Sequence, residues 1–256
     1  MTALFRLRQG DGPIIATAIH DGHLLAPEVA ARLALDDATR LREEDPYTGR
    51  VAELAPTSIV ALRSRFEVDL NRPRNQAVYR TPAEAWGLEL WRTPCTEEHV
   101  ARALAQYDAF YALLARVLRA HAESHGRFVV LDVHSYNHRR DRIPADPAKN
   151  PEINIGTGSL DRARWGRLVD RFIEGLSACA VRGHRLDVRA NVKFAGGELC
   201  RWVHRTFPET GCALAIELKK TFMDEWTGTL DEPHLAELGT AIMTTFPELV
   251  RELANA

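Results

Sequence analysis

The sequence predicts an α/β fold in which helices pack against a mostly parallel β-sheet. Short apolar runs typical of buried strands alternate along the chain with longer segments of helical periodicity. The run at 128–133 (FVVLDV) is almost continuously apolar, as are strands in the centre of a parallel sheet. The 256 residues, 45% of them hydrophobic, can bury a sizeable core, and we find neither a long linker nor an internal repeat. We therefore expect a single domain over residues 1–256.

The first 70 residues are predicted to contain three strands and one short helix. The β-branched run at 13–19 is the first predicted strand, and the apolar runs at 59–62 and 66–70 are two more. Residues 27–35 are expected to form a short helix, because a proline near the first turn is typical of a helix start.

The clearest helix is predicted from Glu97 to about Ser124. Its apolar residues recur at steps of three and four positions and therefore form one stripe on the helix surface. Thr96 is a suitable N-cap residue, and Gly126 is expected to end the helix. The predicted central strand at 128–133 follows directly.

The second half of the chain continues the alternation of helices and strands. A helix is expected over 160–181, with Gly183 ending it. Strands are expected at 186–192 and 212–218, and a last helix at 233–253. Ligands of such sheets gather beyond the carboxyl ends of the strands, so polar residues at those ends are candidates for a functional site.

Composition and charge exclude several classes of protein. With 33 basic and 35 acidic residues the net charge is -2. The sequence has no basic stripe of the kind that would indicate a nucleic-acid partner. No apolar run approaches the roughly 18 residues needed to span a bilayer, and the N-terminus lacks the apolar core of a signal peptide. No cysteine pair has C-x-x-C spacing. We expect a cytoplasmic protein with reduced thiols and no membrane partner.

Polar side chains stand at the ends of several predicted strands. They lie in His20–His23 (HDGH), in Asp69–Arg72 (DLNR), in Asp132–Ser135 (DVHS) and at Glu217. Burying such groups is costly unless they are paired or bound to a metal. Two histidines from different strands and a carboxylate form a typical catalytic zinc set, whose fourth position holds a water with a pKa lowered to about 7. Glu217 is then expected to shuttle the proton of that water.

Each of these motifs also has a structural interpretation. A histidine after a strand is commonly a hydrogen-bonded structural residue, and Asp69–Arg72 could be a turn with a surface arginine. We interpret Gly156–Gly158 (GTG) as a loop and Arg139–Arg142 (RRDR) as a solvated charge run. The occurrence of several polar groups at strand ends in one α/β chain favours the functional interpretation. In it, Asp132 is expected to orient the imidazole of His134, two residues further on.

At these residues the sequence resembles the N-formylglutamate amidohydrolase family. It is more distantly similar to the aspartoacylase and succinylglutamate desuccinylase group of zinc carboxypeptidase-like hydrolases. The resemblance implies a three-layer α/β sandwich with a mixed, mostly parallel sheet, like that of the carboxypeptidase and phosphorylase–hydrolase fold. Five stretches, in family order, carry it: His20–His23, Leu41–Pro46 (LREEDP), Ser64–Arg72 (SRFEVDLNR), Leu131–Ser135 (LDVHS) and Ile216–Leu218 (IEL) with Met223–Glu225 (MDE).

The resemblance also implies a ligand set for one zinc ion per chain. His20 and His134 are two of the ligands that it implies. For the third ligand we favour Asp45 in the acidic segment over Glu44. His23 is the alternative, because His23 matches the spacing of a desuccinylase-like H-x-x-E motif. This chain departs from both patterns, since it has HDGH where formylglutamate hydrolases more often have H-S-G.

The remaining roles follow from the same resemblance. Asn71 and Arg72 would bind the substrate's carboxylate with Arg65 assisting, and an arginine fork suits that geometry. Glu217 would act first as general base and then as acid, and Lys219 would add positive charge for a second carboxylate or an oxyanion. The expected substrate is a small anionic acyl-amino acid, N-formyl-L-glutamate above all. The alternatives are a deacylase or peptidase for another acyl-amino acid or short peptide, and a metal-free carboxylate-binding protein.

Overall fold

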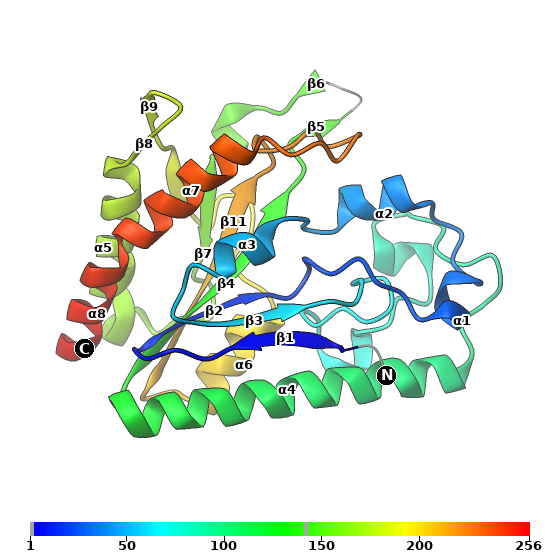
Figure 1. The fold of residues 1–256 in the computed structure, drawn as a ribbon, viewed down its shortest axis with the longest axis horizontal. Helices are drawn as coiled ribbons and strands as arrows, with labels where there is room; N and C mark the ends of the chain where they lie inside the picture. Colours follow the sequence, from blue (N-terminus) through cyan, green and yellow to red (C-terminus); the bar gives the residue numbers. More distant parts are fainter. Residues whose placement is uncertain (1–2, 141–142) are drawn as a thin grey trace.

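The computed structural model describes residues 3–140 and 143–256, and its centre is a mixed β-sheet (Figure 1). Within these residues seven strands join in the order β1-β3-β2-β4-β11-β7-β10. Four strand pairs are parallel, while β1 with β3 and β11 with β7 are antiparallel. The strands are β1 Phe5–Arg8, β2 Ile14–Ala18, β3 Thr57–Ala61, β4 Phe128–Tyr136, β7 Ile153–Gly156, β10 Val188–Ala190 and β11 Gly211–Lys219. The predicted fold class, α/β with a mostly parallel sheet, is confirmed.

Helices cover both faces of this sheet, which gives three layers. Figure 1 shows α4 (Glu97–His125) along one face, where α6 (Glu198–Thr206) also packs. The other face is covered by α3 Thr48–Ala52, α5 Arg162–Ala178, α7 Glu232–Thr244 and α8 Phe246–Asn255. Strand β4 serves both cores because its side chains alternate: Val129 and Leu131 face the second group of helices, and Phe128 and Val130 face α4.

Short elements connect these layers. They are the helices α1 Pro27–Ala30 and α2 Asp37–Glu43, the 3₁₀ turns Arg74–Gln76, Pro82–Ala85 and Pro147–Lys149, and the strand pairs β5 Arg139–Arg140 with β6 Ile143–Pro144 and β8 Ala180–Val181 with β9 His184–Arg185. Residues 141–142 of the predicted charge run lie outside the described residues, and Arg139 is exposed. None of the described helices combines the length and apolarity needed to cross a bilayer.

The strongest local signals were predicted correctly. The strands expected at 13–19, 59–62, 128–133 and 212–218 are present as β2, β3, β4 and β11. The hydroxyl of Thr96 accepts a hydrogen bond from the His99 amide at the start of α4, and Gly126 ends this helix with a φ of 75°. Gly156–Gly158 is largely a loop, as expected, although Gly156 still belongs to β7.

The segment 66–70 is not a strand. It begins in a helical turn, in which the amides of Glu67 and Val68 both donate to the carbonyl of Ser64. An ion pair of 2.9 Å between Arg65 and Asp69 stabilises that turn, because residues four apart meet on a helical turn and not on a strand. The apolar side chains of the segment are buried in the core without entering the sheet.

Other predicted elements end earlier than expected. The helix at 27–35 is only the short α1, and the strand at 186–192 is only β10. Helix α5 ends at Ala178, before the predicted 181, and Gly183 lies in the turn between β8 and β9 with a φ of 81°. The last helix is two helices, because Pro247 lacks the amide needed to continue α7 and instead lies in the first turn of α8.

Candidate functional site

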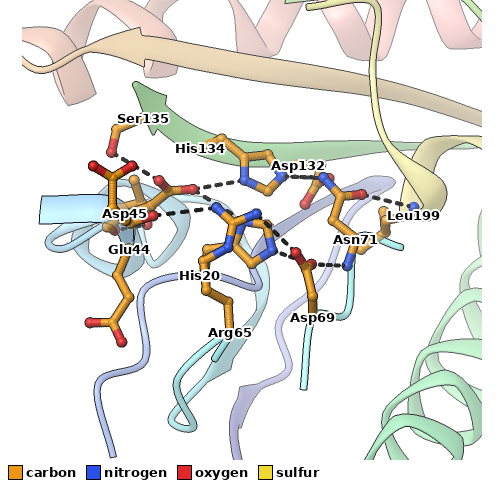
Figure 2. Close-up of polar contacts among 12 residues, drawn as sticks. His20, Glu44, Asp45, Arg65, Asp69, Asn71, Asp132, His134, Ser135 and Leu199 are labelled. Atoms are coloured by element: carbon orange, nitrogen blue, oxygen red, sulfur yellow. Dashed lines mark hydrogen bonds and ion pairs between the residues drawn. The ribbon is translucent and has the colours of Figure 1, made fainter. Parts of the chain in front are cut away.

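Three buried side chains from distant parts of the sequence converge near the carboxyl ends of β2 and β4. They are His20, which follows β2, Asp45, which follows α2, and His134 in β4; one ligand atom of each lies within 4.8 Å of the others. Asp45 Oδ2 is 2.9 Å from His134 Nδ1 and 3.3 Å from His20 Nδ1. The amide of Asp45 also donates to the carbonyl of His20, which fixes the two segments together. Figure 2 shows the carboxylate of Asp45 beside both rings.

The far nitrogen of each imidazole is held by its own carboxylate. Asp69 Oδ1 lies 2.7 Å from His20 Nε2, and Asp132 Oδ2 lies 2.9 Å from His134 Nε2. His134 Nε2 also lies 3.3 Å from Asn71 Nδ2. In the tautomer in which both Nε2 atoms donate their protons to these carboxylates, the lone pairs of both Nδ1 atoms face Asp45. His20 Nδ1 is buried and has no hydrogen-bond partner among the described residues. This donor set fits a divalent metal ion such as zinc, with carboxylates orienting both histidines from behind.

The electrostatics of the site favour a bound cation. Burial alone would raise the pKa of Asp45, but in the metal-free site the protonated imidazoles of His134 and His20 outweigh it and hold this pKa well below its usual range. The charge of Arg65 and the bond to His20 do the same for the pKa of Asp69. Burial lowers the pKa of His134, yet the charge of Asp132 raises it well above its usual value. The same negative surroundings would stabilise a metal ion in place of a proton.

Glu217 lies next to this group, in a cavity of about 490 Å³. It is the neighbour of His134 in the register between β11 and β4. Burial raises the pKa of Glu217 to about 7, so that its carboxyl can both take and release a proton near neutral pH. The cavity is lined by His20, Arg42, Glu43, Asp45, Arg65, Asn71, Trp86, Leu88, His134, Ser135, Tyr136, Asn137, Arg139, Lys193, Phe194, Glu217 and Lys220.

Besides Glu217, two more of the predicted catalytic and substrate-binding residues line this cavity, Arg65 and Asn71. Arg65 donates a hydrogen bond of 2.9 Å to Asp69, and its guanidinium lies 4.8 Å from the centre of the Trp86 ring. Asn71 Oδ1 accepts a hydrogen bond of 3.1 Å from the amide of Leu199 at the start of α6 (Figure 2). This close approach requires a glycine at 197, because a Cβ there would lie 2.1 Å from Asn71 Oδ1.

Arg72 and Lys219, the other two predicted substrate-binding residues, are not among the residues that line the cavity. The guanidinium of Arg72 donates a 2.8 Å hydrogen bond to the carbonyl of Glu84 and lies over the ring of Tyr79. The ammonium of Lys219 donates to the carbonyl of Asn150 at 3.2 Å. The structure therefore places neither cation in the cavity, and each is bonded to a backbone carbonyl instead.

His23 and Glu44, the alternatives considered for the third ligand, belong to a separate cluster. His23 Nδ1 is bonded to Glu44 Oε2, and Arg40 donates to the other oxygen of Glu44 at 3.2 Å. Figure 2 shows the side chain of Glu44 directed away from the two histidines that Asp45 contacts. The structure thus brings Asp45, not His23 or Glu44, together with His20 and His134.

Sequence reasoning assigned no role to several charged residues of the site. Asp69 belongs to the DLNR motif, but the sequence does not predict its bond to His20. Lys220 lines the cavity although Lys219 does not; its side chain is almost fully buried and donates to the carbonyls of Arg42 (2.6 Å) and Glu44 (2.7 Å). Burial lowers the pKa of Lys220 to about 8. The only sequence signal for it was the pair of lysines directly after a predicted strand.

Comparisons with known proteins agree on one family. Residues 12–223 match the family described as N-formylglutamate amidohydrolase. An N-formylglutamate deformylase of Pseudomonas aeruginosa is 28% identical over 266 residues, which cover 95% of this chain and 94% of that protein. The crystal structure of an N-formylglutamate amidohydrolase from Ralstonia eutropha JMP134 superposes with a TM-score of 0.79 at 17% identity, over 99% of each chain. A gene product of Agrobacterium tumefaciens gives a TM-score of 0.62 at 17% identity, over 99% of this chain and 96% of its own.

Proposed function

The chain belongs to the N-formylglutamate amidohydrolase family, and we propose that it is a zinc-dependent hydrolase that cleaves N-formyl-L-glutamate to formate and glutamate. The observation that carries this proposal is the placement of Glu217 in one cavity with His20, Asp45 and His134. The name of the Pseudomonas aeruginosa relative, a deformylase of N-formylglutamate, supports the choice of substrate.

In this proposal His20, Asp45 and His134 hold one zinc ion per chain. Both histidines offer Nδ1, since Asp69 and Asp132 occupy their Nε2 atoms. When bound, zinc would supply a Lewis acid and lower the pKa of water toward about 7. Three protein ligands are typical of catalytic zinc sites, whereas structural sites commonly have four.

Glu217 moves the proton in the proposed reaction. Its carboxylate takes a proton from the attacking water and later delivers it to the nitrogen of the leaving amine. One group can serve both steps because its pKa, raised to about 7 by burial, lies close to neutral pH. The position of Glu217 beside His134 in the sheet keeps it within the cavity.

Asn71 and Arg65 are proposed to bind the α-carboxylate of the substrate. Both line the cavity, and both are held in place by protein contacts: Arg65 by Asp69, and Asn71 by the start of α6. Holding the substrate in the reactive geometry in this way can remove a substantial part of the activation barrier of hydrolysis. We propose that Arg72 supports this wall from outside, since it joins the segment after Asp69 to the carbonyl of Glu84.

The substrate is tested with a panel of N-formyl-, N-acetyl- and N-succinyl-L-glutamate. We expect zinc-loaded protein to release glutamate fastest from the formyl compound, and protein stripped with a chelator to release almost none. Preference for another acyl group would agree with the proposed hydrolase activity but would contradict N-formyl-L-glutamate as the substrate. Protein that binds glutamate but hydrolyses none of the three compounds would be a binding protein.

The base role of Glu217 predicts the direction of the pH dependence. Glu217 must be ionised to accept a proton, and a bound divalent cation would lower its pKa from about 7. We therefore expect kcat/KM to fall with decreasing pH on an acid limb at or below about pH 7, by up to about tenfold per pH unit for one group. Rates of N-formylglutamate hydrolysis measured across this range check the prediction. A kcat/KM that increases as the pH is lowered would contradict the base role.

A further inference from the structure

The cations that line the cavity differ in whether the protein supplies them with a counterion. Arg65 forms an ion pair with Asp69 at 2.9 Å, and Arg42 forms one with Glu43 at 2.6 Å. Lys220 is only 1% exposed, and no carboxylate among the described residues forms an ion pair with it. Its ammonium donates to the two backbone carbonyls of Arg42 and Glu44. Lys220 is therefore a buried positive charge with uncharged acceptors.

This arrangement leaves Lys220 able to bind an anion. An ammonium group has three N–H donors, and the two carbonyls use two of them. The charges of Asp45, Glu43 and Glu225 act on Lys220 without a direct bond to it. A carboxylate that enters the cavity would therefore gain a strong, charge-assisted hydrogen bond there. The side chain reaches the cavity because the strand alternation stops at the end of β11, and the chain turns after Lys219.

The position of Lys220 decides which carboxylate it meets. Its ammonium is bonded to the carbonyl of Glu44 and so lies on the Asp45 side of the two histidines. Figure 2 shows Asn71 on the opposite side of them. Arg65 lies between Lys220 and Asn71, since it donates to the carbonyl of Glu43 at 3.4 Å. If the α-carboxylate binds at Asn71 with Arg65 assisting, as proposed above, the far end of an acidic amino acid extends past Arg65 toward Lys220.

We propose that the ammonium of Lys220 binds the side-chain carboxylate of the substrate and makes this site selective for acidic amino acids. The inference rests on the proposed function, because it takes the substrate to be an acyl-amino acid. It assigns to Lys220 the second-carboxylate role that the sequence suggested for its neighbour Lys219.

Binding of the amino-acid product separates this role from catalysis. L-Glutamate and L-glutamine have side chains of nearly the same shape, but glutamate ends in a charged carboxylate and glutamine in a neutral carboxamide. Both are titrated calorimetrically into zinc-loaded wild type, Lys220→Met and Lys219→Met. We expect wild type to prefer glutamate and Lys220→Met to bind glutamate about 10- to 100-fold more weakly, the effect of a hydrogen bond between charged groups. Glutamine binding should change little in this variant. Lys219→Met should keep the preference of wild type.

Three results would overturn the role of Lys220: equal affinity of wild type for the two amino acids, an unchanged preference in Lys220→Met, or an equal loss of affinity for both. The last result would mean that Lys220 only holds the segment that carries Asp45 in place. A reduced zinc content of the variant would indicate the same structural role. Hydrolysis of N-formylglutamate by wild type is measured separately. Turnover with an unchanged preference in Lys220→Met rejects this inference alone, and absence of turnover rejects the proposed function.

Discussion

Replacement of Glu217 by glutamine is expected to lower kcat for N-formylglutamate by about 100- to 10,000-fold, the range that general acid–base catalysis contributes. Glutamine has nearly the same shape as glutamate but cannot accept the proton of the attacking water. Glu217 is not one of the three residues proposed as ligands, so the variant should still bind about one zinc ion per chain, as that ligand set requires.

The measurement combines steady-state rates with the zinc content of the same preparation. The thermal midpoint serves as the control for folding, and it should not decrease, because the substitution removes a carboxylate whose burial is unfavourable. A variant with near-normal kcat would remove Glu217 from the mechanism. A variant that loses its zinc would instead place Glu217 among the metal ligands.

Replacement of Asp45 by asparagine is expected to weaken zinc binding by more than about 100-fold, the upper end of the effect found for outer partners of metal ligands. Asp45 lies between the two histidines, and its ionised carboxylate is stabilised by both. Asparagine keeps the size of the side chain but not the charge. Competition with a chromophoric chelator measures the affinity, and turnover should be lost together with the metal.

His23→Ala is the matched control for this experiment. The sequence spacing allowed His23 as the third ligand, but its ring is bonded to Glu44 away from the site. The variant should keep its zinc affinity within a few-fold of wild type and should still turn over substrate. Loss of zinc in His23→Ala with retention in Asp45→Asn would reverse the assignment of the third ligand.

Local signals in the sequence were sufficient for much of the fold. The apolar run of β4 and the stripe and caps of α4 depend on neighbouring residues, so periodicity and capping rules apply to them directly. The strand predicted at 66–70 was wrong for a physical reason: the apolar side chains of this segment are buried equally well when the backbone forms a turn. Pro247 is a sequence signal for the break between α7 and α8, although a single helix was expected there.

The proximity of the candidate site residues was predictable where they follow or occupy a strand, as His20, His134 and Glu217 do. Parallel strands bring such residues to one edge of the sheet, so their proximity follows from the fold class. Asp45 could not be separated from His23 in this way, because it arrives on a segment between β2 and β3 whose path depends on long-range contacts.

The choice between Lys219 and Lys220 also depended on tertiary structure. Side chains alternate along β11, so Lys219 lies on the same face of the sheet as Glu217. The strand ends at Lys219, and the alternation therefore does not predict the direction of the Lys220 side chain. Only the three-dimensional structure shows that Lys220 reaches the cavity while the ammonium of Lys219 is bonded to the carbonyl of Asn150.

The central claim is a hydrolase whose activity depends on one metal ion held by His20, Asp45 and His134. The most direct test is to titrate zinc into metal-free protein and to measure the rate of formate release from N-formyl-L-glutamate at each ratio. We expect the rate to rise with added zinc and to level off at about one ion per chain, the stoichiometry of a site with three protein ligands. Equal rates for metal-free and zinc-loaded protein, or no formate release at full loading, would contradict this account.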